Sequence, residues 1–145
     1  MEMKFAGVMR RVNILASELD NSYHKAALKL GMADSVMLTL YIIYERGGSC
    51  PLGTIKRELG MSKQTLNSAV RKLEADGTIY LEQTGGRTKT AYLTDAGREY
   101  AVNTVGRLFW AETAAFDGWS EEEISEYLRL MEKYNNDFKL KIENL

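Results

Sequence analysis

The fold is decided by residues 52–94, whose sequence is LGTIKRELGMSKQTLNSAVRKLEADGTIYLEQTGGRTKTAYLT. Apolar residues at helical spacing predict a first helix that stops at Gly60, a residue suited to a left-handed helix cap. Ser62 can then accept a hydrogen bond from the free N–H groups of a second helix. Two helices joined by so short a turn must cross steeply, which lets the second project its outer face into a groove.

Two β-rich runs follow this pair of helices. Residues 79–81 and 91–93 flank a Gly85-Gly86 pair, and Arg87 and Lys89 lie beside it. Glycines between two such runs predict a hairpin turn. A hairpin turn explains Gly85-Gly86 better than a phosphate-binding loop does. The predicted fold is therefore mainly α with a small β-hairpin wing, a winged helix-turn-helix of the α+β class.

The second helix is predicted to end at Gly77 and to have one apolar and one polar face. Its buried positions are Leu66, Ala69, Val70 and Leu73. At about 100° per residue, the positions on the opposite face are Gln64, Asn67, Ser68 and Arg71. Gln and Asn can pair with adenine edges, Arg with guanine, and Ser with either base or with phosphate. The alternative is an ordinary solvated helix face, which carries the same residue types.

Basic and hydroxyl side chains flank this face and suit contacts with phosphate, aided by the positive helix N-terminus. We predict a DNA-binding set in which the wing residues reach the minor groove. The set is Ser62, Lys63, Gln64, Thr65, Asn67, Ser68, Arg71, Lys72, Arg87 and Lys89.

The order and spacing of these pieces resemble the MarR family of winged helix-turn-helix transcriptional regulators. The resemblance covers nearly the whole chain and is carried by residues 59–66 (LGMSKQTL), 73–79 (LEADGTI) and 93–98 (LTDAGR), with Arg87 in the wing. The family usually has an acidic residue two positions before the wing arginine, where this chain has Gly85. The resemblance implies a homodimer that binds double-stranded DNA and responds to a small aromatic or phenolic effector.

Length and composition fit one subunit spanning residues 1–145, because 45% hydrophobic content can supply one sizeable core. The net charge is −1 overall, but residues 51–94 hold seven bases and four acids, a local charge of +3, which leaves −4 for the remainder. Positive charge is thus concentrated on the segment that would meet phosphate. We expect residues 34–94 to form the DNA-binding lobe, and residues 1–33 with 95–145 a helical dimerisation lobe.

The flanking segments are predicted to be long amphipathic helices. An apolar stripe predicts a helix over residues 4–29, and a second helix begins at Asp34 or Ser35 and ends at Gly47-Gly48. Pro51 suits the first turn of the helix that follows. Thr94 can cap a helix running to about Asp117, and Ser120 with Glu123 predicts a capping box for the last helix.

These N- and C-terminal helices exceed what a small winged-helix core needs to cover itself. Exposed apolar stripes of that length favour a partner, and a second copy related by a two-fold axis is the expected one. The alternative is that the helices fold back on their own domain. A two-fold dimer would present two reading helices, so the DNA site would be a pseudo-palindrome with half-sites about one helical turn apart.

Other chemistry-bearing residues are few. One Cys, one His and the absence of a ligand cluster predict no metal site and no cofactor. We interpret Cys50 as a buried, inert thiol rather than a redox sensor, and His24 as a hydrogen-bonded structural residue rather than an effector ligand. No nucleophile with a plausible base is present, so we predict no catalytic residue and no enzyme. The N-terminus lacks the layout of a secretory signal, and no membrane span is expected, so we expect a cytoplasmic protein.

Aromatic residues are numerous between the two expected lobes. Most are expected to belong to the core or the dimer contact. We predict Tyr41, Tyr44 and Trp110 as the wall of an effector pocket.

The prediction from sequence is a homodimeric, sequence-specific regulator of transcription, acting as a repressor. One alternative is a winged-helix protein-interaction module without DNA binding, which would lack salt-sensitive binding to random duplex DNA. The other is a small enzyme that uses the aromatic crevice, for which the sequence offers no residue set.

Overall fold

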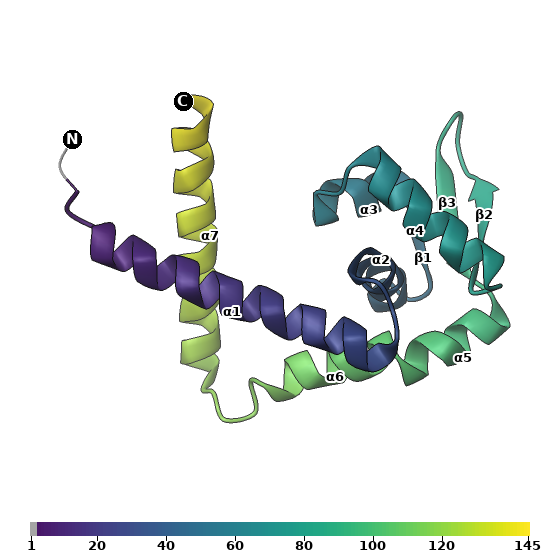
Figure 1. Cartoon of the computed structure of the whole chain (residues 1–145), viewed down its shortest axis with the longest axis horizontal. Helices are drawn as coiled ribbons and strands as arrows, with labels where there is room; N and C mark the ends of the chain where they lie inside the picture. Colours follow the sequence, from purple (N-terminus) through teal and green to yellow (C-terminus); the bar gives the residue numbers. More distant parts are fainter. Residues whose placement is uncertain (1–2) are drawn as a thin grey trace. The chain divides into compact units, whose positions relative to one another are not determined.

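The computed structural model describes residues 3–145 (Figure 1). Its elements in chain order are α1 (Ala6–Leu30), α2 (Asp34–Glu45), β1 (Ser49–Pro51), α3 (Leu52–Leu59), α4 (Lys63–Ala75), β2 (Ile79–Gln83), β3 (Lys89–Leu93), α5 (Asp95–Asn103), α6 (Val105–Ala114) and α7 (Glu121–Glu143). The mainly helical winged helix-turn-helix predicted from the sequence is confirmed. The described chain divides into two compact units, one extending to Phe109 and the other covering Trp110–Leu145.

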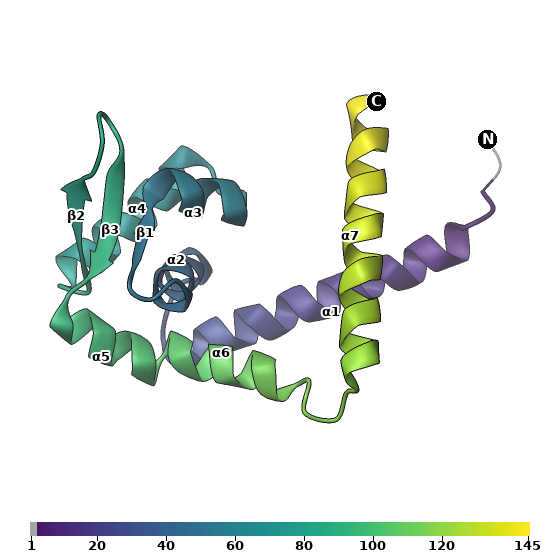
Figure 2. The same ribbon diagram turned by 180° about the vertical axis from the view of Figure 1, so that it is seen from behind.

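The three strands form one antiparallel sheet in the order β1-β3-β2. Tyr80 pairs with Tyr92 across β2 and β3, and their rings stack with centroids 5.3 Å apart. On the other side of β3, Cys50 pairs with Ala91. From behind, the β2–β3 hairpin extends beyond the helices as the wing (Figure 2). The sheet therefore joins the wing to the segment that leads into the helix-turn-helix.

The core of the first unit is centred on α2, in which Met37, Leu40 and Ile43 are fully buried. The inner faces of α3, α4 and the sheet pack around it. Helix α4 forms the most extensive helix–helix contact with α2. The apolar periodicity of the sequence thus identified the buried residues. The helices of the helix-turn-helix pack against α2.

Two details of the predicted boundaries are wrong. Pro51 ends β1 and caps α3, with φ −61° and ψ 139°, rather than lying in the first turn of that helix. The helix expected from Thr94 to about Asp117 is broken at Thr104, whose φ of −122° and ψ of −89° separate α5 from α6. The hydroxyl of Thr104 donates to the carbonyl of Tyr100 at 2.7 Å and so competes for a carbonyl of the preceding turn.

The predicted helix starts are confirmed where a capping residue was identified. The hydroxyl of Thr94 accepts a hydrogen bond from Gly97 N–H at 2.8 Å. At α7, Ser120 and Glu123 form the reciprocal capping box. Helix α1 (Ala6–Leu30) begins two residues after and ends one residue after the range of 4–29 that the sequence predicts.

Within residues 3–145 no single helix is long and apolar enough to cross a membrane. In this part of the chain, one pair of helices, α1 and α2, meets such a test of length and composition when taken together, and the pair is bent by 90°.

The wing is joined to α5 by a close backbone contact. The hydroxyl of Thr94 donates to the carbonyl of Gly77 at 2.6 Å while it caps α5. A Cβ built on Gly97 would lie 1.8 Å from the carbonyl oxygen of Thr78, so only glycine allows α5 to approach the start of β2. These contacts fix the start of β2 against the start of α5.

We expect Gly97→Ala to destabilise the protein by about 3 kcal/mol or more, because the added methyl group forces the backbone of α5 away from β2. Gly53→Ala is the matched control, since a Cβ at Gly53 in α3 meets nothing within 4 Å. The control should be neutral or stabilising by up to about 1 kcal/mol. Urea denaturation measures both changes, and equal stability of the two variants would contradict the close contact at Gly97.

Candidate nucleic-acid interface

Helix α4 is fixed at its N-terminus by Ser62. The Ser62 Oγ accepts a hydrogen bond from Thr65 N–H at 3.1 Å, as the sequence predicts for a cap. The same hydroxyl donates to Thr65 Oγ1 at 2.9 Å. Ser62 is therefore engaged within the helix, while the hydroxyl hydrogen of Thr65 remains available as a donor to an incoming phosphate.

One face of α4 is buried and the other is open. Leu66, Ala69, Val70 and Leu73 are at most 4% exposed. On the opposite face, Gln64, Ser68 and Arg71 are exposed. Asn67 is half-buried, because it lies at the border between the two faces rather than at the centre of the outer one. The polar ridge of α4, meaning Gln64, Ser68 and Arg71 with Asn67 at its edge, is thus accessible to a ligand.

Basic side chains flank this ridge, and they differ in their surroundings. Lys63 at the start of α4 is exposed. Lys72 forms an exposed ion pair with Asp76, one turn further along the helix, with Nζ 3.2 Å from Oδ2. Among the described residues, no carboxylate forms an ion pair with Arg71. The charge of Lys72 is partly balanced by its own helix, whereas that of Arg71 is not.

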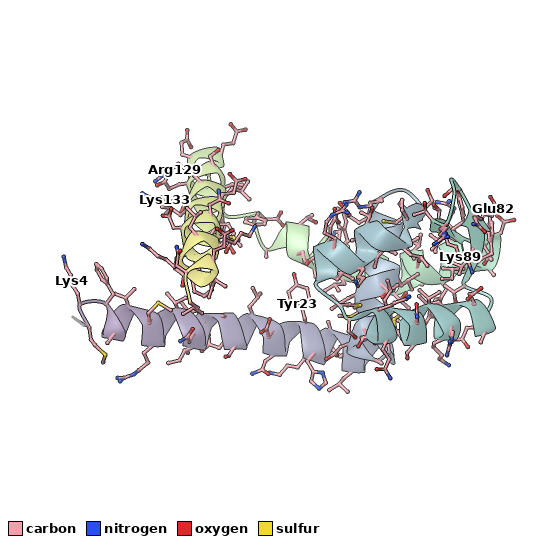
Figure 3. The ribbon with its side chains drawn as sticks, turned by 90° about the horizontal axis from the view of Figure 1, so that it is seen from above. Lys4, Tyr23, Glu82, Lys89, Arg129 and Lys133 are labelled. Carbon is pink, nitrogen blue, oxygen red and sulfur yellow. The ribbon has the colours of Figure 1, made fainter. Side chains whose placement is uncertain are left out.

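The wing presents two further bases. Arg87 lies in the turn between β2 and β3 and is exposed, and Lys89 begins β3, where it pairs in register with Gln83. Lys89 and Glu82 lie on the two neighbouring strands of the wing (Figure 3). Gly85 and Gly86 have φ of 121° and 61°, so both glycines are needed for the backbone of this turn.

Several residues that shape the interface were not identified from the sequence. Gln83 and Thr88 donate side-chain hydrogen bonds to the carbonyls of Gly86 and Gly85 at the tip of the wing. The signal that could have indicated them is the presence of polar side chains with donor groups on both sides of a glycine pair.

Cys50 is fully buried in β1, which confirms the prediction of a buried thiol. Burial raises the pKa of the Cys50 thiol, and the charge of nearby Arg46 opposes this only in part. The approach of Arg46 was not identified from the sequence, because the turn after α2 brings it close to Cys50. A thiol that is buried and protonated is a poor nucleophile, so the structure favours an inert residue.

His24 is a hydrogen-bonded structural residue, as predicted. Its Nδ1 lies 2.9 Å from Oδ1 and 3.0 Å from Oδ2 of Asp34. This contact joins the last turns of α1 to the first residue of α2. In the described part of the chain, no group of three or more His, Cys, Asp or Glu side chains is arranged to hold a metal ion.

The aromatic residues proposed for an effector pocket have different surroundings. Tyr41 and Tyr44, on α2, each contact the ring of Phe109, with centroids 6.2 Å and 6.5 Å apart. Tyr44 also packs against Gly106, where an added Cβ would lie 3.1 Å from its hydroxyl. Trp110 is 71% exposed. A pocket formed by these three residues stays a prediction.

Comparison with known proteins shows similarity to one family. The model of the MarR family matches residues 30–87, which contain α2, the helix-turn-helix and the first part of the wing. This region of the chain is therefore similar to the MarR family, as the resemblance of the sequence predicts. A comparison with curated proteins found no match.

Solved structures of MarR family proteins share the fold over nearly the whole chain. A regulator from Neisseria meningitidis is 16% identical, with a TM-score of 0.80 and 99% of each chain covered. A regulator from Silicibacter pomeroyi is 22% identical, with a TM-score of 0.70, covering 92% of this chain and 94% of its own. One from Listeria monocytogenes, solved in complex with 26mer DNA, is 21% identical, with a TM-score of 0.69 and coverage of 89% and 87%.

Proposed function

We propose that this protein is a MarR family regulator, a sequence-specific repressor that binds double-stranded DNA as a homodimer. Residues 34–94 form the DNA-binding lobe, and the helices of residues 1–33 and 95–145 form the dimerisation lobe. Gln64, Asn67, Ser68 and Arg71 read bases in the major groove, while Ser62, Lys63, Thr65 and Lys72 lie near phosphates. Arg87, with Lys89 beside it, enters the adjacent minor groove. The protein acts in the cytoplasm.

The observation that carries this proposal is the exposed polar ridge of α4. A helix whose inner face is buried and whose outer face carries Gln, Ser and Arg side chains presents the groups that pair with base edges. The similar regulator from Listeria monocytogenes was solved in complex with DNA, which supports the same role for this chain. The local charge of +3 over residues 51–94 also favours phosphate.

A second copy of the chain is the proposed partner of the long helices. Within α7, all of which the structure describes, no residue is buried. One face of α7 carries large apolar side chains that are exposed in the single chain, namely Tyr127, Leu128, Met131, Tyr134 and Phe138. Helix α1 likewise exposes Val8, Met9, Leu15 and Leu19, and Phe5 at its N-cap is exposed as well. Apolar faces of this length favour a protein partner over water.

Two-fold symmetry then determines the form of the operator. Two α4 helices related by a two-fold axis require a pseudo-palindrome whose half-sites are about one helical turn apart. A small aromatic or phenolic effector would act by changing the separation of the two α4 helices, since they must fit successive grooves. Tyr41, Tyr44 and Trp110 are proposed to contact it. Release of the operator by such a compound, measured by fluorescence anisotropy, would test this response.

We expect Arg71→Ala to weaken binding to the operator by about 1–3 kcal/mol and to relax the preference at one base position. Lys72→Ala should instead weaken binding to all sequences alike and reduce the salt slope by about 1. Asp76→Asn is the matched control, because it frees Lys72 and should strengthen binding to all sequences. Anisotropy titrations at several salt concentrations, with an operator and a random duplex, measure these effects. A uniform loss for both alanine variants would refute base reading by Arg71.

We expect Leu128→Glu with Phe138→Glu to convert the dimer into a monomer, because two charges would be placed on the apolar face of α7. Light scattering after size exclusion should show the mass falling to that of one chain, 16.4 kDa. Lys133→Glu is the control, since Lys133 lies on the opposite side of α7, the side that also carries Arg129 (Figure 3). A wild-type protein that is monomeric at micromolar concentration would contradict the dimer.

A further inference from the structure

Arg87 follows a pair of glycines, whose backbone dihedral angles are the least restricted of any residue. It follows directly after Gly85 and Gly86, both of which have positive φ. Glycine populates more of conformational space than any other residue, so a tip with two glycines is expected to sample many arrangements. An arginine attached to such a tip would be poorly aimed unless other groups hold the turn.

Side chains on both sides of the turn supply that restraint. Among backbone groups, Thr84 N–H donates to the carbonyl of Thr88 at 3.0 Å, and Thr88 N–H donates to that of Gly85 at 3.1 Å. The hydroxyl of Thr88 donates to the same Gly85 carbonyl at 2.6 Å. The side-chain amide of Gln83 donates to the carbonyl of Gly86. The carbonyl groups of both glycines are therefore held.

The contact made by Gln83 acts one bond away from the arginine. The carbonyl oxygen of Gly86 belongs to the planar peptide group that also contains the nitrogen of Arg87. Holding that oxygen fixes the plane from which the Arg87 side chain departs. Gln83 and Thr88 are themselves exposed, so core packing does not account for them.

We propose that Gln83 and Thr88 are positioning residues for Arg87, which hold the wing tip in the conformation that inserts the guanidinium into the minor groove. This proposal rests on the proposed function. A tip that is already ordered loses less conformational entropy when it binds DNA, and affinity rises accordingly. The restraint comes from neutral groups, and within residues 3–145 no carboxylate forms an ion pair with Arg87. The positive charge of the Arg87 guanidinium is therefore available to interact with DNA.

The test uses the full-length chain and an operator selected from random duplexes. Gln83→Met keeps the length of the side chain and removes its donor, while Thr88→Val keeps the shape and removes the hydroxyl. Each should weaken operator binding roughly three- to tenfold, the range of one hydrogen bond. Thr88→Ser retains the hydroxyl and should bind within about twofold of wild type. Because these positions are exposed, urea denaturation should show unchanged stability.

A double-mutant cycle separates positioning from a direct contact with DNA. In an Arg87→Ala background, Gln83→Met and Thr88→Val should cause no further loss, because there is no guanidinium left to position. In the free protein, Gln83→Met should also lower the NMR order parameter of the Arg87 amide. Losses by the same factor in both backgrounds, or no loss in either, would overturn the proposal.

The cycle also distinguishes this proposal from the proposed function. If Arg87→Ala weakens binding and the Gln83 and Arg87 effects are additive, the positioning role alone is wrong. If Arg87→Ala binds like wild type while Arg71→Ala does not, the wing contact is wrong, and the positioning role falls with it. If the wild-type chain shows no sequence preference among duplexes, the proposed function is refuted.

Discussion

The structure depends on the one-sided burial of α4. Leu66, Ala69, Val70 and Leu73 are held against α2 and the sheet, and this burial fixes the rotation of the helix about its axis. With 3.6 residues in each turn, the opposite positions must then point away from the core. Gln64, Ser68 and Arg71 are exposed for that reason, and the cap at Ser62 determines where the helix begins.

The start of the wing is held by contacts with the end of α4 and the start of α5. Thr94 caps α5 and also holds the carbonyl of Gly77, and Gly97 lets α5 touch the start of β2. The end of α4, the start of the wing and the start of α5 therefore meet at one junction. The polar ridge and the wing bases therefore belong to the same compact unit, which suits contact with neighbouring grooves at the same time.

Much of this arrangement could be predicted because it depends on local chemistry. Ser62, Thr94 and Ser120 marked helix starts, and apolar spacing identified the buried face of α4. The break at Thr104 could not be predicted in the same way. A threonine at that point is compatible with a continuing helix, and the break depends on its hydroxyl bonding the carbonyl of Tyr100 and on the packing of Gly106 against Tyr44. The half-burial of Asn67 likewise depends on what packs beside α4.

Side-chain contacts that depend on the path of the backbone were also missed. The proximity of Arg46 to Cys50 arises from the turn between α2 and β1, and the bond from Gln83 to Gly86 arises from the closure of the hairpin. The surroundings of Tyr41 and Tyr44 depend on Phe109, which is more than 60 residues away along the chain. Patterns of residue type predict the elements well, whereas side-chain contacts that link elements need the three-dimensional structure.

The central claim is that the polar ridge of α4 meets base edges in the major groove. The most direct measurement is a crystal structure of the full chain bound to a duplex selected for tight binding. We expect polar atoms of Gln64, Ser68 and Arg71 within about 3.5 Å of base edges, with Arg87 in the flanking minor groove. A complex in which the ridge faces solvent while the duplex lies against another surface would contradict it.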